Sequence, residues 1–124
     1  MKIPNNLLYT KDHEWVHIDE DVATIGVTDY AQGELGDIIF VEFPNKGEQY
    51  NSGDPIGTIE AVKTVADIYT PIDGEILEVN VELEDNPEII NKDPYKKGWI
   101  IKLCNINKDI SILLSSSEYQ DLIQ

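Results

Sequence analysis

The chain has 124 residues, of which 24 are acidic and nine are basic, and its formal charge is −15. This length suits one domain with a modest core, and the charge argues against nucleic acids and anionic membranes as partners. The apolar content of 41% argues against disorder. No segment is long enough to span a membrane, and the single Cys104 excludes an internal disulfide.

In chain order, the first elements are a predicted hairpin and a short helix. Residues 12–18 and 22–27 each alternate their side chains between two faces, and an acidic turn separates them. This pattern is typical of two antiparallel strands. Thr28 or Asp29 can then cap a helix of one or two turns, which Gly36 ends.

Two more strands are predicted further along the chain. The dense apolar run 38–43 favours a buried strand over a helix because of its length. Residues 75–81 alternate so that Leu77, Val79 and Val81 share one face.

The C-terminal part changes from strand to helix periodicity. Residues 99–104 indicate a strand, whereas the apolar residues from 110 onward are spaced for a helix. Ser115 and Glu118 form a capping-box pattern. We therefore expect a C-terminal helical segment at about 108–124, attached to a β core at about 12–104.

A weak internal repeat relates two parts of this core. Residues 36–41 resemble residues 74–79, and residues 57–59 resemble residues 98–100 at a similar distance along the chain. Such similarity indicates one supersecondary unit used twice. We expect two quasi-symmetric half-sheets, with short helices packed on them.

Lys63 lies between two short predicted strands, at residues 56–61 and 66–70. This places it at the tip of a hairpin that connects the two copies of the repeat. The pattern alone does not distinguish an amine that an enzyme modifies from an ordinary surface lysine, because most lysines are exposed.

The segment His13-Glu14-Trp15-Val16-His17 matches the zinc-protease pattern H-E-x-x-H. That chemistry needs a helix to bring both histidines onto one face. On the predicted strand the two histidines share a face but stand about 13 Å apart, and the chain has no third histidine. A zinc hydrolase is therefore the disfavoured alternative, and no nucleophile elbow or phosphate loop indicates another enzyme.

Several motifs, spread over almost the whole chain, resemble those of the H proteins of the glycine cleavage system. The matching segments are 13–15, 23–28, 31–32, 35–37, 60–63, 71–75, 91–95 and 98–99. The resemblance implies a mainly β barrel-sandwich hybrid fold with a C-terminal helix, as a single lipoyl-carrier domain over 1–124. It also implies lipoic acid joined by an amide to Lys63, which lacks the flanking methionines that are usual in biotin carriers.

The same resemblance implies roles for residues around the lipoyl arm. Glu60 would be recognised by the lipoylating enzyme, and a cleft would shelter the methylamine-loaded arm from water. The residues at the matching cleft positions are Asp12, Glu14, Val27, Glu34, Leu35 and Asp67. Glu14 and Asp67 are the expected carboxylate contacts. Glu34 replaces a histidine and Asp12 a serine that are common in the family, and all these carboxylates could instead be plain solvated groups.

The implied function is transport without catalysis or a bound metal. The arm would carry methylamine from glycine decarboxylase (P protein) to aminomethyltransferase (T protein), and dihydrolipoamide dehydrogenase (L protein) would reoxidise it. A lipoyl-relay protein that donates lipoate to other enzymes is the alternative. We expect a monomer in the bacterial cytoplasm, or in the mitochondrial matrix for a processed eukaryotic chain.

Overall fold

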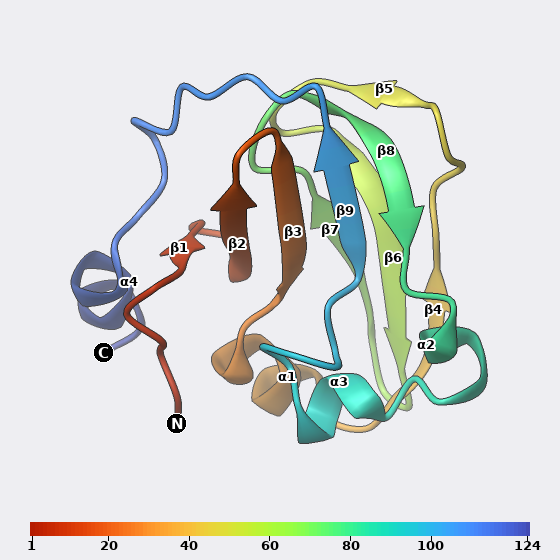
Figure 1. Ribbon diagram of the computed structural model, residues 1–124. Coiled ribbons are helices and arrows are strands. Elements are labelled where there is room, and N and C mark those ends of the chain that lie inside the picture. The colour runs from red at the N-terminus through yellow and green to blue at the C-terminus, as the bar shows by residue number, and fades with distance from the viewer.

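The structure is a computed structural model that describes residues 1–124, and it is mainly β, with two antiparallel sheets and four short helices (Figure 1). The larger sheet has the strand order β1-β2-β3-β9-β8-β5, and the smaller sheet has the order β4-β6-β7. The strands are β1 (Leu8–Tyr9), β2 (Glu14–Asp19), β3 (Val22–Val27), β4 (Ile38–Glu42), β5 (Gln49–Tyr50), β6 (Pro55–Ala61), β7 (Val65–Tyr69), β8 (Gly74–Val79) and β9 (Ile101–Cys104). The helices are α1 (Asp29–Leu35), α2 (Glu82–Asp85), α3 (Ile89–Lys92) and α4 (Ser116–Ile123). The expected fold class is confirmed as a sandwich-like arrangement, although the sheets do not close into a barrel.

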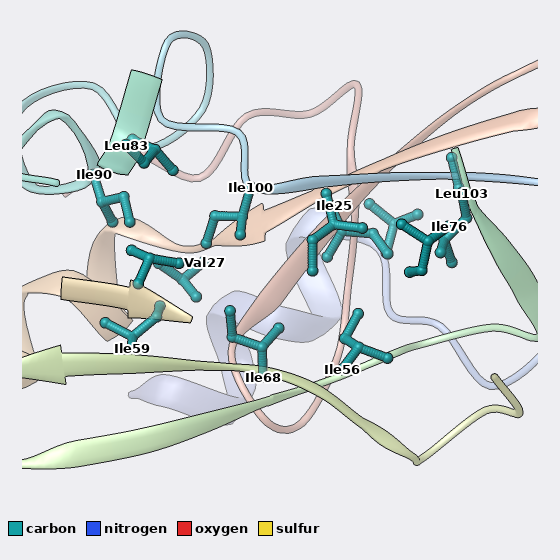
Figure 2. Packing of buried hydrophobic residues seen from close by; sticks show 14 of the residues in the cluster. Ile25, Val27, Ile56, Ile59, Ile68, Ile76, Leu83, Ile90, Ile100 and Leu103 are labelled. Carbon is teal, nitrogen blue, oxygen red and sulfur yellow. The ribbon is translucent and has the colours of Figure 1, made fainter. Parts of the chain in front are cut away.

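A cluster of 17 buried apolar residues forms the main core. Figure 2 shows Ile59 and Ile68 of the smaller sheet pointing toward the layer that contains Ile25 of the larger sheet, while Leu83 and Ile90 cover one end. Each fully buried aliphatic side chain contributes about 1.5–3 kcal/mol. This shared layer therefore holds the two sheets together.

The predicted N-terminal hairpin and first helix are confirmed. Strands β2 and β3 pair antiparallel from Asp19 opposite Val22. Thr28 is the N-cap of α1, because its side-chain oxygen accepts a hydrogen bond from the backbone N–H of Ala31 at 3.1 Å. Gly36 ends the helix with φ of 78°, which a residue with a Cβ rarely adopts.

The two copies of the repeat occupy equivalent places in different sheets. The first copy forms β4, which pairs with β6, and the second forms β8, which pairs with β9. Each copy has a register shift at the same repeat position, between Ile38 and Phe40 and between Ile76 and Glu78. The Lys63 hairpin lies within the smaller sheet, however, and does not join the two half-sheets as expected.

The predicted strands at 38–43 and 75–81 are confirmed as β4 and β8, but each is only partly buried. The apolar run 38–43 is not a fully buried strand, since Phe40 is 51% exposed. In β8 the core residue is Ile76, whereas Leu77 and Val81 are exposed. Both strands contain a register shift, and a strict alternation of faces does not continue through such a shift.

The C-terminal helix begins later than predicted. The capping box is confirmed: Ser115 accepts from the backbone N–H of Glu118, whose side chain accepts from the N–H of Ser115. Residues 108–114 are not helical, because Leu114 is extended and exchanges two backbone hydrogen bonds with Tyr9. This pairing of distant segments outweighs the local helical spacing of the apolar residues.

Four small elements were not predicted at all. Helices α2 and α3 have four residues each and bury one apolar residue each, Leu83 and Ile90. Strands β1 and β5 have two residues each. Elements this short do not show a periodic pattern. None of the four helices has the length and apolar character needed to cross a bilayer.

A second, smaller apolar cluster attaches α4 to the beginning of the chain. It contains Leu7, Tyr9, Trp15 and Tyr119. The rings of Tyr9 and Tyr119 are stacked, with centroids 4.8 Å apart. Figure 1 shows the result, with α4 beside β1 and β2 and both chain termini on that side of the molecule.

Candidate functional site

The turn of residues 62–64 presents Lys63 at the end of the hairpin formed by β6 and β7. The turn is fixed by its backbone, since the N–H of Ala61 donates to the carbonyl of Thr64 at 2.8 Å. The N–H of Val62 also donates to the carbonyl of Asp37 at 3.1 Å. Lys63 itself is exposed and makes no hydrogen bond or ion pair. The predicted hairpin tip is confirmed, and it combines a fixed backbone with a free amine.

A cleft of about 320 Å³ lies between the start of β2, helix α1 and the edge strand β7. It brings together all six residues at the expected cleft positions: Asp12, Glu14, Val27, Glu34, Leu35 and Asp67. Glu14 and Val27 meet because they are direct partners in the β2–β3 register. Ala66, which also lines the cleft, is three residues from Lys63, or about 10 Å along an extended strand.

Glu14 is the only acidic residue of the cleft that is buried, with 2% of its surface exposed. One carboxylate oxygen accepts from the hydroxyl of Thr10 at 2.6 Å, and the other accepts from the backbone N–H of Tyr69 at 3.3 Å. No cation contacts it. Burial raises the pKa of Glu14 to about 7, although the two donated hydrogen bonds act in the opposite direction. The side chain is therefore poised between its neutral and charged forms near neutral pH.

The other three carboxylates make the cleft strongly acidic. Asp12, Glu34 and Asp67 are exposed at its rim. The hydroxyl of Thr58 donates to Asp67 at 3.4 Å. No lysine lines the cleft, so its electrostatic preference is for a cation.

His13 is a cleft residue that sequence reasoning considered only as a zinc ligand. Its Nδ1 lies 2.8 Å from the hydroxyl of Tyr119, which lies 2.8 Å from the hydroxyl of Thr28. The three groups thus form a hydrogen-bonded chain. Burial lowers the pKa of His13, which favours its neutral form.

As the sequence indicated, the H-E-x-x-H segment does not lie on a helix. Glu14 begins strand β2, and His13 precedes the strand in a left-handed conformation with φ of 69°. The two histidines therefore do not share a strand face, which corrects the sequence-based placement. His13 lines the cleft, whereas His17 is exposed outside it. No group of three or more His, Cys, Asp or Glu side chains is arranged to hold a metal ion.

Glu60 lies outside the cleft. It is exposed on β6, opposite Phe40 on one side and Val65 on the other. Its position, three residues before Lys63, puts it on the surface next to the hairpin tip rather than in the shelter.

Comparisons with known proteins point to one family. The family model described as glycine cleavage H-protein matches residues 7–124. Glycine cleavage system H proteins from two strains of Staphylococcus epidermidis are 50% identical over 124 residues, which covers 99% of this chain and 98% of theirs. The crystal structure of a glycine cleavage system H protein from Mycobacterium marinum is similar, with a TM-score of 0.88 and 36% identity. That match covers 96% of this chain and 97% of the other.

Proposed function

From the premise that this chain belongs to the glycine cleavage H-protein family, whose members are lipoyl carriers, we propose that Lys63 is the residue that carries the lipoyl group. The observation that supports this is a free amine on a hairpin tip whose own strands line an acidic cleft. A carrier needs both parts, one for attachment and one for shelter.

Both parts suit a lipoyl group. Forming an amide neutralises the ammonium group, and Lys63 has no partner to lose through that change. The cleft volume falls within the range of small-molecule sites, about 300–1,000 Å³. Its apolar residues, including Val27, Leu35 and Ile68, suit a hydrocarbon arm. When attached, the group supplies reversible dithiol chemistry that holds a methylamine cargo between glycine decarboxylase, aminomethyltransferase and dihydrolipoamide dehydrogenase.

Glu14 is the residue that we propose to hold the protonated amine of this cargo. A buried carboxylate without a cation partner gains more from an arriving positive charge than an exposed one does. That charge would lower the pKa of Glu14 and favour its ionised form. Asp67 and Asp12 attract the amine from the rim, while Val27 and Leu35 exclude the water that would hydrolyse the cargo.

In this proposal the chain presents and shelters a group, and its partner enzymes perform the chemistry. Glu60 is the recognition residue for the enzyme that attaches the group. We further propose that the protein acts as a monomer in the bacterial cytoplasm, since the relatives described above are bacterial.

The test is a mass measurement followed by reconstitution. After co-expression with a lipoylating enzyme, peptide mapping should show a lipoyl increment on the peptide that contains Lys63, and its persistent absence would refute the proposal. With the three partner enzymes, the modified chain should support glycine cleavage.

The reconstituted glycine assay also separates the carrier from a lipoyl relay, because a relay protein never holds methylamine and would not support glycine cleavage. A second measurement tests the role of Glu14. For a carrier, the loaded form of Glu14→Ala should hydrolyse faster than the unchanged loaded form. An unchanged lifetime would remove Glu14 from the mechanism.

A further inference from the structure

A second cavity lies on the outward face of the larger sheet. It has a volume of about 410 Å³ and is lined by Trp15 and His17 of β2 and by Lys102 of β9, among others. Neighbouring residues of a strand point to opposite faces, so Trp15 faces this cavity whereas Glu14 faces the cleft. We name the cavity the basic pocket, after His17, Lys96 and Lys102 in its wall.

The wall of the basic pocket differs in charge from the rest of the chain. It contains two lysines and one histidine, and no aspartate or glutamate lines it. The whole chain, in contrast, has 24 acidic and nine basic residues, and the cleft alone is lined by four carboxylates. The local electrostatic preference of this pocket is therefore for an anion.

The cationic groups of the basic pocket are not used within the chain. Neither Lys96 nor Lys102 forms a salt bridge. The strand register places Lys102 between Thr24 of β3 and Glu78 of β8. Its Nζ nevertheless lies over the ring of Trp99, 4.8 Å from the centroid, and not on the Glu78 carboxylate. This cation–π contact orients the ammonium group and leaves its charge available to a ligand.

The aromatic part of the wall is held in place by hydrogen bonds. Nε1 of Trp15 donates to the carbonyl of Pro94 at 3.0 Å. The hydroxyl of Tyr95 donates to the carbonyl of Lys2 at 2.6 Å and accepts from the N–H of Asp29 at 2.9 Å. The pocket is therefore formed before any ligand arrives, and its volume falls within the range of small-molecule sites, about 300–1,000 Å³.

We propose that the basic pocket binds a small organic anion, with a carboxylate or phosphate group on an aromatic body. The anionic group contacts the ammonium groups of Lys96 and Lys102, and the aromatic body contacts Tyr95 and Trp99. This site goes beyond the proposed function and does not depend on it, because none of its lining residues lines the cleft or belongs to the Lys63 hairpin.

Tryptophan fluorescence of the full-length chain tests this site, because the chain has two tryptophans and both line the basic pocket. The probes are phenylacetate and phenyl phosphate, and uncharged phenylacetamide is the reference. They are titrated in about 0.15 M salt, where charges more than about 8 Å away are largely screened. At least one anion should give a saturable change with a Kd about fivefold below that of phenylacetamide, and the tighter anion identifies the preferred group. No saturable change with either anion, or the same Kd for anions and amide, would overturn the site.

Three lysine variants show whether the pocket itself provides the charge. Lys102→Met keeps an apolar stem against Trp99 and removes the ammonium group, so it should raise the Kd of the bound anion about fivefold and leave that of phenylacetamide unchanged. Lys96→Ala should raise the Kd of the anion about threefold. Lys97→Ala is the matched control, because Lys97 is exposed beside Lys96 but does not line the pocket. Equal effects of Lys97→Ala and Lys102→Met would overturn the site.

Chemical shifts in the NMR spectrum of the unchanged chain locate the bound anion. With phenyl phosphate, the indole N–H signals of Trp15 and Trp99 should shift, whereas the backbone amide signals of Ala66 and Asp67 in the cleft should stay in place. Shifts confined to the cleft or to the Lys63 hairpin would overturn the basic pocket as the anion site.

Discussion

The hairpin tip differs from a group of side chains that we call the seam, His13, Glu14, Thr28 and Tyr119, in how charge is exposed to water. At the tip, Lys63 is exposed and has no partner, while its backbone is held by hydrogen bonds. In the seam, Glu14 is almost fully buried and accepts hydrogen bonds only from neutral donors. The tip therefore acts by presenting an exposed amine, whereas the seam acts through a carboxylate that is removed from water. Substitutions at the tip should change function and leave stability unchanged, whereas substitutions in the seam should change both function and stability.

The largest expected effect is at the tip. Lys63→Arg removes the nucleophilic amine, because a guanidinium stays protonated, so lipoylation measured by intact mass should be lost completely. The free energy of unfolding should change by no more than about 0.5 kcal/mol, since the side chain contacts nothing. A substantial loss of stability would show that the tip is not independent of the fold.

Glu14→Gln should have the next largest effect, on the pH dependence of stability. The pKa of Glu14 is about 7 in the folded chain and about 4.5 without burial. Between these values the folded chain holds a proton that the unfolded chain has released, so this contribution to stability is complete below pH 4.5 and is lost as pH rises through 7. The variant should thus be more stable than the unchanged chain by about 3 kcal/mol at pH 8 and similar to it at low pH. Urea denaturation at both pH values measures this, and a difference that does not depend on pH would contradict the buried titration.

Tyr119→Phe tests the hydrogen-bond chain of the seam. It removes the hydroxyl that joins His13 to Thr28 and leaves the buried Thr28 hydroxyl without that hydrogen-bond partner. We expect a loss of about 1 kcal/mol in the free energy of unfolding. Tyr30→Phe is the matched control, because Tyr30 also lines the cleft but its hydroxyl makes no hydrogen bond. Equal losses in the free energy of unfolding for the two variants would exclude a special role for this hydrogen-bond chain.

The smallest effect is expected at the rim of the cleft. Asp67→Asn should shorten the lifetime of the methylamine-loaded arm by about twofold at low ionic strength, because an exposed charge contributes less than 1 kcal/mol. The effect should vanish in about 1 M salt, where the Debye length is near 3 Å. The effect of Glu14→Ala should persist there, since buried charges are screened less. If both effects fade together, the distinction between rim and seam is wrong.

The parts of the molecule that the sequence predicts well depend on local patterns. The β2–β3 hairpin, the Thr28 cap, the Ser115 capping box and the Lys63 tip each follow from residues close in sequence. The resemblance to a family added the six cleft positions, which the fold gathers in one place. Their roles stay predictions.

The features that the sequence did not predict depend on strand register and on contacts between segments that are far apart in the sequence. The burial of individual side chains in β4 and β8 does not follow from the sequence, because a register shift interrupts alternation in both strands. The contact between His13 and Tyr119 spans 106 residues, and no local pattern encodes it. The same is true of the extended Leu114, which pairs with Tyr9 instead of continuing the helix backward.

The hydrogen bond between Tyr119 and His13 also joins parts of the site that are synthesised at different times. Both strands of the Lys63 hairpin precede α4 by a long stretch of chain, and a ribosome adds about 5–20 residues per second. Roughly 3–11 s therefore separate synthesis of the lysine from synthesis of the tyrosine that completes the hydrogen-bond chain. During translation, the hairpin that presents the amine is made first, and the last link of its shelter is made at the end.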